Sequence, residues 1–146
     1  MISNTELMIM DWVMVDGKPT QVIALGSDNT ITTIGNRKVS RRKVSPVRIT
    51  PKILIDNGFE EIHHKDSEGG WLSYKLEFKF EERFDGNGKC IFPKYIELAK
   101  MRNEKEVWGL QVEYGMENAL LSVKYVHNLQ HIMDVTEVYK SIIIRP

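Results

Sequence analysis

The sequence of 146 residues lacks several features that would point to a specialised class of protein. Its one cysteine, Cys90, excludes an internal disulfide and a zinc site built from several cysteines, so we expect a reducing compartment. No stretch approaches the roughly 20 apolar residues that a membrane span needs. The first residues have no basic region, and Glu6 and Asp11 interrupt their apolar run, so they do not read as a signal peptide. These absences favour a soluble cytoplasmic protein without a membrane partner.

Motifs of the common enzyme classes are also missing. Gly69 and Gly70 lead into an alternating segment typical of a strand, whereas a phosphate-binding loop leads into a helix. There is no G-x-S-x-G sequence, and Cys90 stands in no catalytic motif. We therefore expect a protein that is not an enzyme and that binds no cofactor.

Charge is balanced over the whole chain but unevenly placed along it. The 20 basic and 20 acidic side chains cancel. Residues 1–55 hold eight of the basic and four of the acidic residues, which gives +4, and residues 56–146 hold twelve and sixteen, which gives −4. Such asymmetry is compatible with two parts that have different partners, or with two parts that attract each other.

Short apolar segments alternate with tight turns over the first 50 residues. The turn sequences are DGKP, GSDN and GNR, and the segments between them are rich in Val, Ile and Thr. This pattern predicts a small SH3-like β-barrel over residues 1–50, because so small a sheet must close or be covered to hide its edges. Its predicted core consists of Trp12, Val13, Val22, Ile23, Leu25, Ile31, Ile34, Val39, Val44, Val47 and Ile49.

Residues 51–146 are expected to complete an α+β protein. Thr50 and Pro51 are typical of a helix start and Gly58 of a helix end, which predicts a short linking helix. A polar connector should follow over residues 60–70. The alternation of polar and apolar residues then predicts an antiparallel three-stranded sheet, with strands over 71–82, 90–98 and 107–114.

A helix over about 122–134 is expected to cover the apolar face of that sheet. The tail, residues 136–146, is either a late strand or an irregular segment that packs through Ile142, Ile143 and Ile144.

Two histidines, His127 and His131, lie one turn apart on that helix and opposite its apolar stripe. Imidazoles so spaced can share a metal ion. In the zinc protease motif, however, a glutamate that acts as general base follows the first histidine, and here Asn128 stands in its place. We interpret the pair as a solvated or partner-facing side of the helix, or as a group that hydrogen-bonds to the barrel or the tail.

A basic cluster is the best candidate for a nucleic-acid footprint. No acidic residue lies between Arg37 and Lys52, and phosphate binding needs several clustered cations. The cluster has no interleaved aromatic residues on which single-stranded bases could stack. The candidate contacts to nucleic acid are Arg37, Lys38, Arg41, Arg42 and Lys43.

Two further groups of residues resemble metal sites. The segment from Asp85 to Lys89 begins like a calcium loop, but Lys89 and Ile96 stand where oxygen ligands are required, so we predict a hairpin turn. His63 and His64 lie among acidic residues in the polar connector, and loop histidines of this kind seldom form a dedicated site.

Three segments, ELMIMDWVMVDGKPTQV, ITPKILIDNGF and VKYVHNLQHIM, resemble a family of small uncharacterised Bacteroidetes proteins found in phage-like or mobile-element contexts. The family usually has glycine where Asp11 stands here, and some of its members have a sequence like HELQH at the histidine pair, where this chain has Asn128. The resemblance covers about half of the chain. It implies a two-part organisation, and it implies no activity and no cofactor.

The leading functional hypothesis is a non-enzymatic protein-binding or adaptor module that contacts its partner through the barrel surface or an exposed strand edge. Its protein partner is unknown, and a homo-oligomer is compatible with the sequence. The second hypothesis is nucleic-acid binding through the basic cluster. The third is a metal-dependent hydrolase at His127 and His131.

Overall fold

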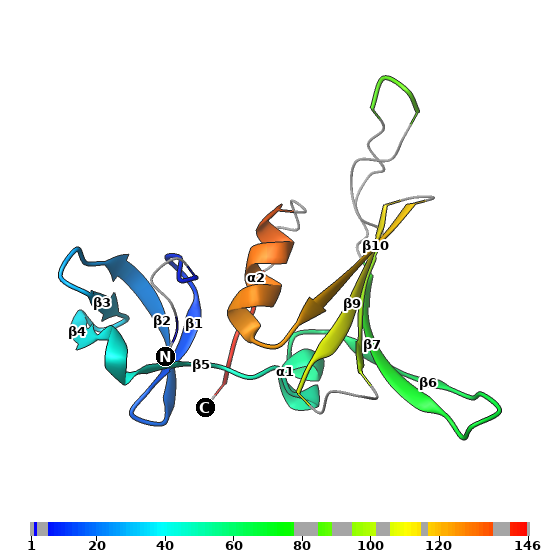
Figure 1. The fold of residues 1–146 in the computed structure, drawn as a ribbon, viewed down its shortest axis with the longest axis horizontal. Helices are drawn as coiled ribbons and strands as arrows, with labels where there is room; N and C mark the ends of the chain where they lie inside the picture. Colours follow the sequence, from blue (N-terminus) through cyan, green and yellow to red (C-terminus); the bar gives the residue numbers. More distant parts are fainter. Residues whose placement is uncertain are drawn as a thin grey trace.

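The chain is mostly β in the computed structural model, which describes residues 2, 6–77, 85–88, 95–101, 106–114, 117–135 and 141–145. Over these residues it has two antiparallel five-stranded sheets (Figure 1). The first sheet has the order β4-β3-β2-β1-β5. Its strands are β1 (Trp12–Val15), β2 (Lys18–Leu25), β3 (Thr30–Thr33), β4 (Arg37–Ser40) and β5 (Val44–Pro46), with a 3-10 helix, η1 (Arg41–Lys43), between the last two.

The first sheet is open, so the predicted closed SH3-like barrel is wrong. β4 and β5 are only four and three residues long, and they form the two ends of the sheet without pairing with each other in its described residues. Part of the predicted barrel core also packs elsewhere, because Trp12, Val47 and Ile49 join the core of the second sheet. Leu25 and Ile34 are exposed. The core of the first sheet consists of Ile2, Leu7, Val13, Val15, Val22, Ile31, Val39 and Val44.

A short helix, α1 (Pro51–Asp56), follows the first sheet and confirms the predicted linking helix. The Thr50 hydroxyl accepts a hydrogen bond from the Ile53 N–H at 3.3 Å, which caps the first turn. Gly58 ends the helix with a φ of 86°, a backbone conformation that residues with a Cβ rarely adopt. Local sequence signals therefore determine both ends of this helix.

The second sheet has five strands rather than the three predicted. Its order is β10-β9-β8-β7-β6, an antiparallel meander. β6 lies where a polar connector was expected, and β10 was not predicted at all. Both are edge strands, and pairing with one neighbouring strand, β7 or β9, holds each of them in the sheet. The strands are β6 (Glu60–His64), β7 (Trp71–Glu77), β8 (Tyr95–Lys100), β9 (Trp108–Tyr114) and β10 (Glu117–Val123).

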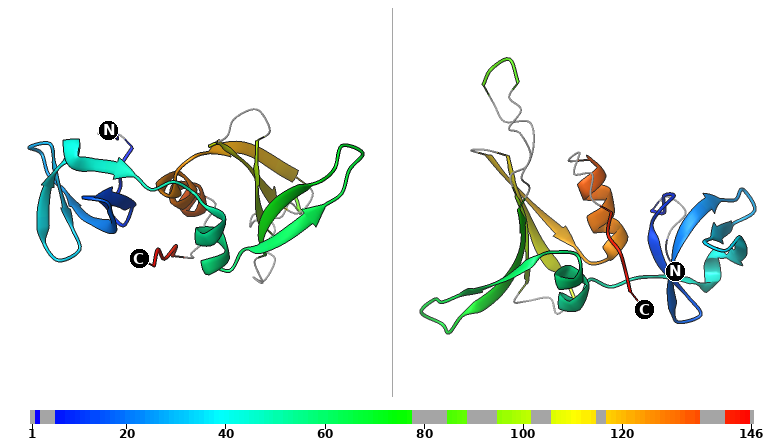
Figure 2. Two further views of the ribbon diagram at one scale, coloured as in Figure 1. Left: turned by 90° about the horizontal axis from the view of Figure 1, so that it is seen from below. Right: turned by 180° about the vertical axis from the view of Figure 1, so that it is seen from behind.

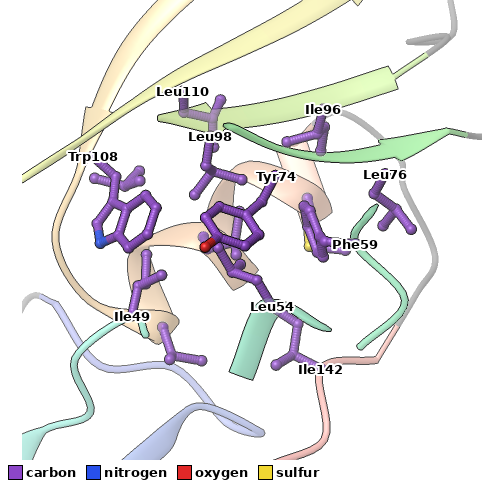
Figure 3. Packing of buried hydrophobic residues seen from close by; sticks show 14 of the residues in the cluster. Ile49, Leu54, Phe59, Tyr74, Leu76, Ile96, Leu98, Trp108, Leu110 and Ile142 are labelled. Atoms are coloured by element: carbon purple, nitrogen blue, oxygen red, sulfur yellow. The ribbon is translucent and has the colours of Figure 1, made fainter. Parts of the chain in front are cut away.

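The second helix, α2 (Val126–Val135), covers one face of the second sheet, as predicted, but begins four residues later than expected. α1, Phe59 and the tail segment 141–145 help to cover the same face (Figure 3). The described part of the tail is irregular, with Ile142 and Ile144 buried and Ile143 exposed. None of the helices in the described residues combines the length and apolar character that a membrane crossing needs.

Candidate functional site

Helix α2 lies between the two sheets (Figures 1 and 2). Val126, Leu129 and Met133 belong to the core of the second sheet. The opposite side of the helix faces the start of β1. There the Gln130 Oε1 accepts a hydrogen bond from the Trp12 N–H at 3.0 Å, and the Gln130 Nε2 donates to the Met10 carbonyl at 3.0 Å. The helix therefore joins the two sheets.

His131 strengthens this junction through a buried carboxylate. Its Nε2 lies 2.9 Å from both oxygens of Asp11, a residue that is only 2% exposed. The Met8 N–H also donates to Asp11, at 2.7 Å. Burial raises the pKa of Asp11 above its usual value, although the Met8 N–H and His131 act in the opposite direction. The suggested hydrogen bond between the histidine pair and the N-terminal part of the chain is thus confirmed for His131.

His127 is buried, so its predicted place on a solvated side of the helix is wrong. The side opposite the apolar stripe does exist, but in the folded protein residues 10–12 contact this side through Gln130 and His131. The ring is 1% exposed and stacks on Tyr125, with ring centroids 5.7 Å apart. Burial is the main cause that lowers the pKa of His127 below its usual value, and the neighbouring His131 lowers it further.

The histidine pair is not arranged as a metal centre in the described residues. The two ring centroids are 5.8 Å apart with the ring planes at 64°. His131 directs its Nε2 at Asp11, and no group of three or more His, Cys, Asp or Glu residues in the described ranges could hold a metal ion. The geometry instead supports a hydrogen-bonded contact between two parts of the fold.

Ion pairs within the first sheet divide the basic cluster. Arg37 pairs with Asp16 and Lys38 pairs with Asp28. Arg37 holds the pKa of Asp16 below its usual range, and Lys38, helped by Thr30, lowers the pKa of Asp28 to about 2. Both acids precede the basic run in the sequence and meet it only when the sheet folds.

The other three members of the cluster differ in exposure. Arg41 is buried, whereas Arg42 and Lys43 are exposed on η1. The structure thus leaves Arg42 and Lys43 as two adjacent exposed cations that form no ion pair with the described residues, where the sequence suggested a patch of five. This is a small footprint for phosphate recognition.

Three polar side chains meet on the face of the second sheet that points away from α2. The His64 Nε2 lies 2.8 Å from the Ser73 Oγ, and Ser73 donates its hydroxyl proton to Glu97. His64 therefore donates to Ser73. A nucleophilic serine needs an exposed hydroxyl that can face a substrate. Ser73 is fully buried, so these three residues form a structural polar chain across β6, β7 and β8.

The calcium-like segment is a turn in its described residues, as predicted. The Gly88 N–H donates to the Asp85 carbonyl, and the Asn87 N–H donates to the Asp85 carboxylate at 2.9 Å. Ile96, at the position where a calcium loop needs glutamate, is buried in β8. Lys89 and Cys90 lie outside the described residues. His63, in β6, lies 3.1 Å from Glu61 of the same strand.

Strand β10 forms an apolar edge that sequence reasoning missed. β10 pairs with β9 alone among the described strands. Leu120 is 80% exposed, and Leu121 is also exposed on the opposite face of the strand. The signal available in the sequence was the apolar stretch ALLSV, whose Val123 is buried against the sheet.

An open pocket of about 600 Å³ lies next to this edge. It is formed by the end of β10, by α2 and by residues at the adjoining ends of β8 and β9. Ser122, Lys124, Asn128 and His131 provide its polar lining, and Met101 is among its apolar lining. Solvent therefore reaches the histidine that contacts Asp11.

No protein family model, curated protein or solved structure matches this chain. Similarity to known proteins therefore supports no particular function. The resemblance to the small Bacteroidetes proteins remains a prediction.

Proposed function

We propose that the protein is a non-enzymatic binding module whose β10 edge accepts an extended segment of a partner protein. The observation that carries this proposal is the edge itself. β10 is seven residues long, pairs with β9 alone in the described part of the sheet, and exposes two leucines. The open side of an edge strand presents backbone N–H and C=O groups that an added strand can pair with.

The other three sheet edges carry features that discourage strand addition. β4 begins with Arg37 and Lys38, which form ion pairs with acids of their own sheet. β5 has three residues and ends in Pro46, which has no N–H to donate. β6 is rich in charge, with the sequence EEIHH. Charges, proline and short length are the usual protection of sheet edges. β10 has no such protection between Ala119 and Val123.

The expected ligand is an extended peptide with apolar side chains on both faces. Leu120 lies on the face that points away from α2, because it pairs across the sheet with Gln111. Leu121 lies on the core face, opposite the buried Leu110. A docked strand would place one side chain beside each leucine, since neighbouring strands keep the same alternation. Main-chain hydrogen bonds would supply affinity, and the leucine contacts would supply specificity.

A displayed library of random peptides, selected on the whole protein, tests this proposal. Selected peptides should bind the wild type in fluorescence anisotropy and lose at least about tenfold in affinity with Leu120→Lys, because a charge on an edge strand opposes pairing. Leu25→Lys is the matched control, since Leu25 is an exposed leucine of the first sheet. Peptides that bind both variants as well as the wild type would contradict the proposal. A dimer that is abolished by Leu120→Lys would identify a second copy as the occupant.

Nucleic-acid binding remains the alternative, and Arg42 and Lys43 are the exposed cations that favour it. It predicts retention on DNA or RNA at low salt, lost when Arg42 and Lys43 are both changed to alanine. Retention that is unaffected by Leu120→Lys but abolished by this double change would favour the alternative over the β10 edge.

A further inference from the structure

The junction between the sheets contains a buried imidazole with an unsatisfied nitrogen. The Nδ1 of His127 is buried and has no hydrogen-bond partner among the described residues. His127 shares its side of α2 with Gln130 and His131, which lie three and four positions later and bind Met10, Trp12 and Asp11. A buried polar atom without a partner destabilises the state that buries it.

The groups around His127 make a positive charge there unfavourable overall. On α2 itself, His131 is the nearest titratable group, and its effect on His127 is repulsive. Tyr125 covers the ring. From the segment before β1, Glu6 favours a charged His127. Asp11 from the same segment directs its carboxylate at His131, and Asp134 on α2 interacts with Asp11.

We propose that protonation of His127 weakens the contact between α2 and the first sheet, so that mild acid favours release at this junction. In the closed state, in which α2 contacts the first sheet, the ring of His127 is neutral. In the open state the ring is exposed to water, where the charged form is stable. Solvent reaches the neighbouring His131 through the open pocket, and the Nε2 of His131 lies within hydrogen-bond distance of Asp11.

The sign of the effect follows from the lowered pKa of His127. As the pH falls below the ordinary histidine value of 6.5, the open state takes up a proton that the closed state does not, and the closed state loses stability. The raised pKa of Asp11 acts in the opposite direction, because the closed state then binds the Asp11 proton more readily. That opposition grows as the pH approaches the carboxylate range, so the release should be clearest in mild acid.

The size of the effect has an upper limit set by one proton. Between about pH 7 and about pH 5.5, a histidine of pKa 6.5 in the open state shifts the ratio of open to closed by at most about eightfold. Exposure of Trp12 would report the opening directly. Its N–H donates to Gln130 and its indole Nε1 donates to the Ile142 carbonyl at 2.6 Å, so both bonds cross the junction.

Hydrogen exchange at these two pH values, corrected for the intrinsic pH dependence of exchange, tests the proposal on the whole protein. Protection of both Trp12 N–H groups should fall up to about eightfold in acid, while amides of the central strand β8 keep their protection. His127→Leu should fold and abolish the fall, because an apolar side chain removes both the titration and the unsatisfied atom. Unchanged Trp12 protection, an equal fall in His127→Leu, or a parallel loss in β8 would overturn the proposal.

A second measurement keeps the proposal testable if His127→Leu does not fold. The ring of His127 can be titrated by NMR in the wild type. A pKa of His127 at or above 6.5 would overturn the proposal. A lower pKa that rises in a variant that cannot form the Trp12 hydrogen bonds would support it.

Discussion

Replacing Asn57 by alanine should detach the described tail from α1 at a predictable cost. Asn57 is buried at the end of α1, and its side-chain amide forms two hydrogen bonds with the backbone of Ile143. The Asn57 Nδ2 donates to the Ile143 carbonyl at 2.8 Å, and the Ile143 N–H donates to the Asn57 Oδ1 at 2.7 Å. These contacts hold Ile142 and Ile144 against the second-sheet core.

The magnitude follows from the two lost bonds. Each contributes roughly 1 kcal/mol net, and a backbone group left poorly solvated adds to this, so we expect a loss of about 2–3 kcal/mol in the free energy of unfolding. The Asn57 Nδ2 also donates to Ile53, but the Asn57 backbone N–H donates to the same carbonyl and remains in the variant. Urea denaturation measures the loss, and hydrogen exchange should show that the Ile143 amide loses protection while β8 does not.

Asn57→Asp is the matched control. Its carboxylate can still accept from the Ile143 N–H, but it can donate to neither carbonyl when it is ionised and to only one of them when it is protonated. The folded state should then favour the protonated carboxyl, so the variant should gain stability as the pH falls towards 4, opposite to an ordinary paired aspartate. A loss below about 0.5 kcal/mol in Asn57→Ala, or an Ile143 amide whose protection does not change, would refute the reasoning.

Three further changes have defined expectations. Thr50→Ala should lower the free energy of unfolding, measured with urea, by about 1 kcal/mol because the Ile53 N–H loses its cap. Thr50→Ser should retain most of that stability, because its hydroxyl can still accept the bond. Leu98→Ala should cost about 2–5 kcal/mol because Leu98 is fully buried in the second-sheet core; a smaller loss would mean that the site collapses around the gap. Lys38→Met should raise the pKa of Asp28 from about 2 towards 3.8, since Lys38 is the largest cause of its lowering. An NMR titration in which Asp28 keeps its low pKa would show that Thr30 and the backbone hydrogen bond maintain it without Lys38.

The sequence was sufficient where structure depends on neighbouring residues. Thr50, Pro51 and Gly58 give the bounds of α1 because capping and a positive φ are local requirements. The periodicity of α2 likewise identified its apolar side correctly. In both cases the physical cause lies within a few residues of the feature.

Prediction failed where a feature depends on residues far apart in the chain. The side of α2 that carries His127 was predicted to be solvated because the residues that contact this side, Asp11 and Trp12, lie at the other end of the sequence. The barrel was predicted because its strands are short and apolar, yet Trp12 and Ile49 pack on the second sheet instead of closing the first. β6 has a polar sequence, and pairing with β7 keeps it in the sheet.

The position of α2 between the sheets has a consequence for how the protein is made. Trp12 and Met14 pack against a core whose helical wall is synthesised more than a hundred residues later. The first sheet therefore leaves the ribosome with one apolar face exposed, and this face stays exposed until α2 has been synthesised. Contacts so distant in sequence form late and slowly, and nascent chains in this state are prone to aggregate. Yield during expression should consequently depend on the speed of translation and on chaperones more than the stability of the finished molecule would suggest.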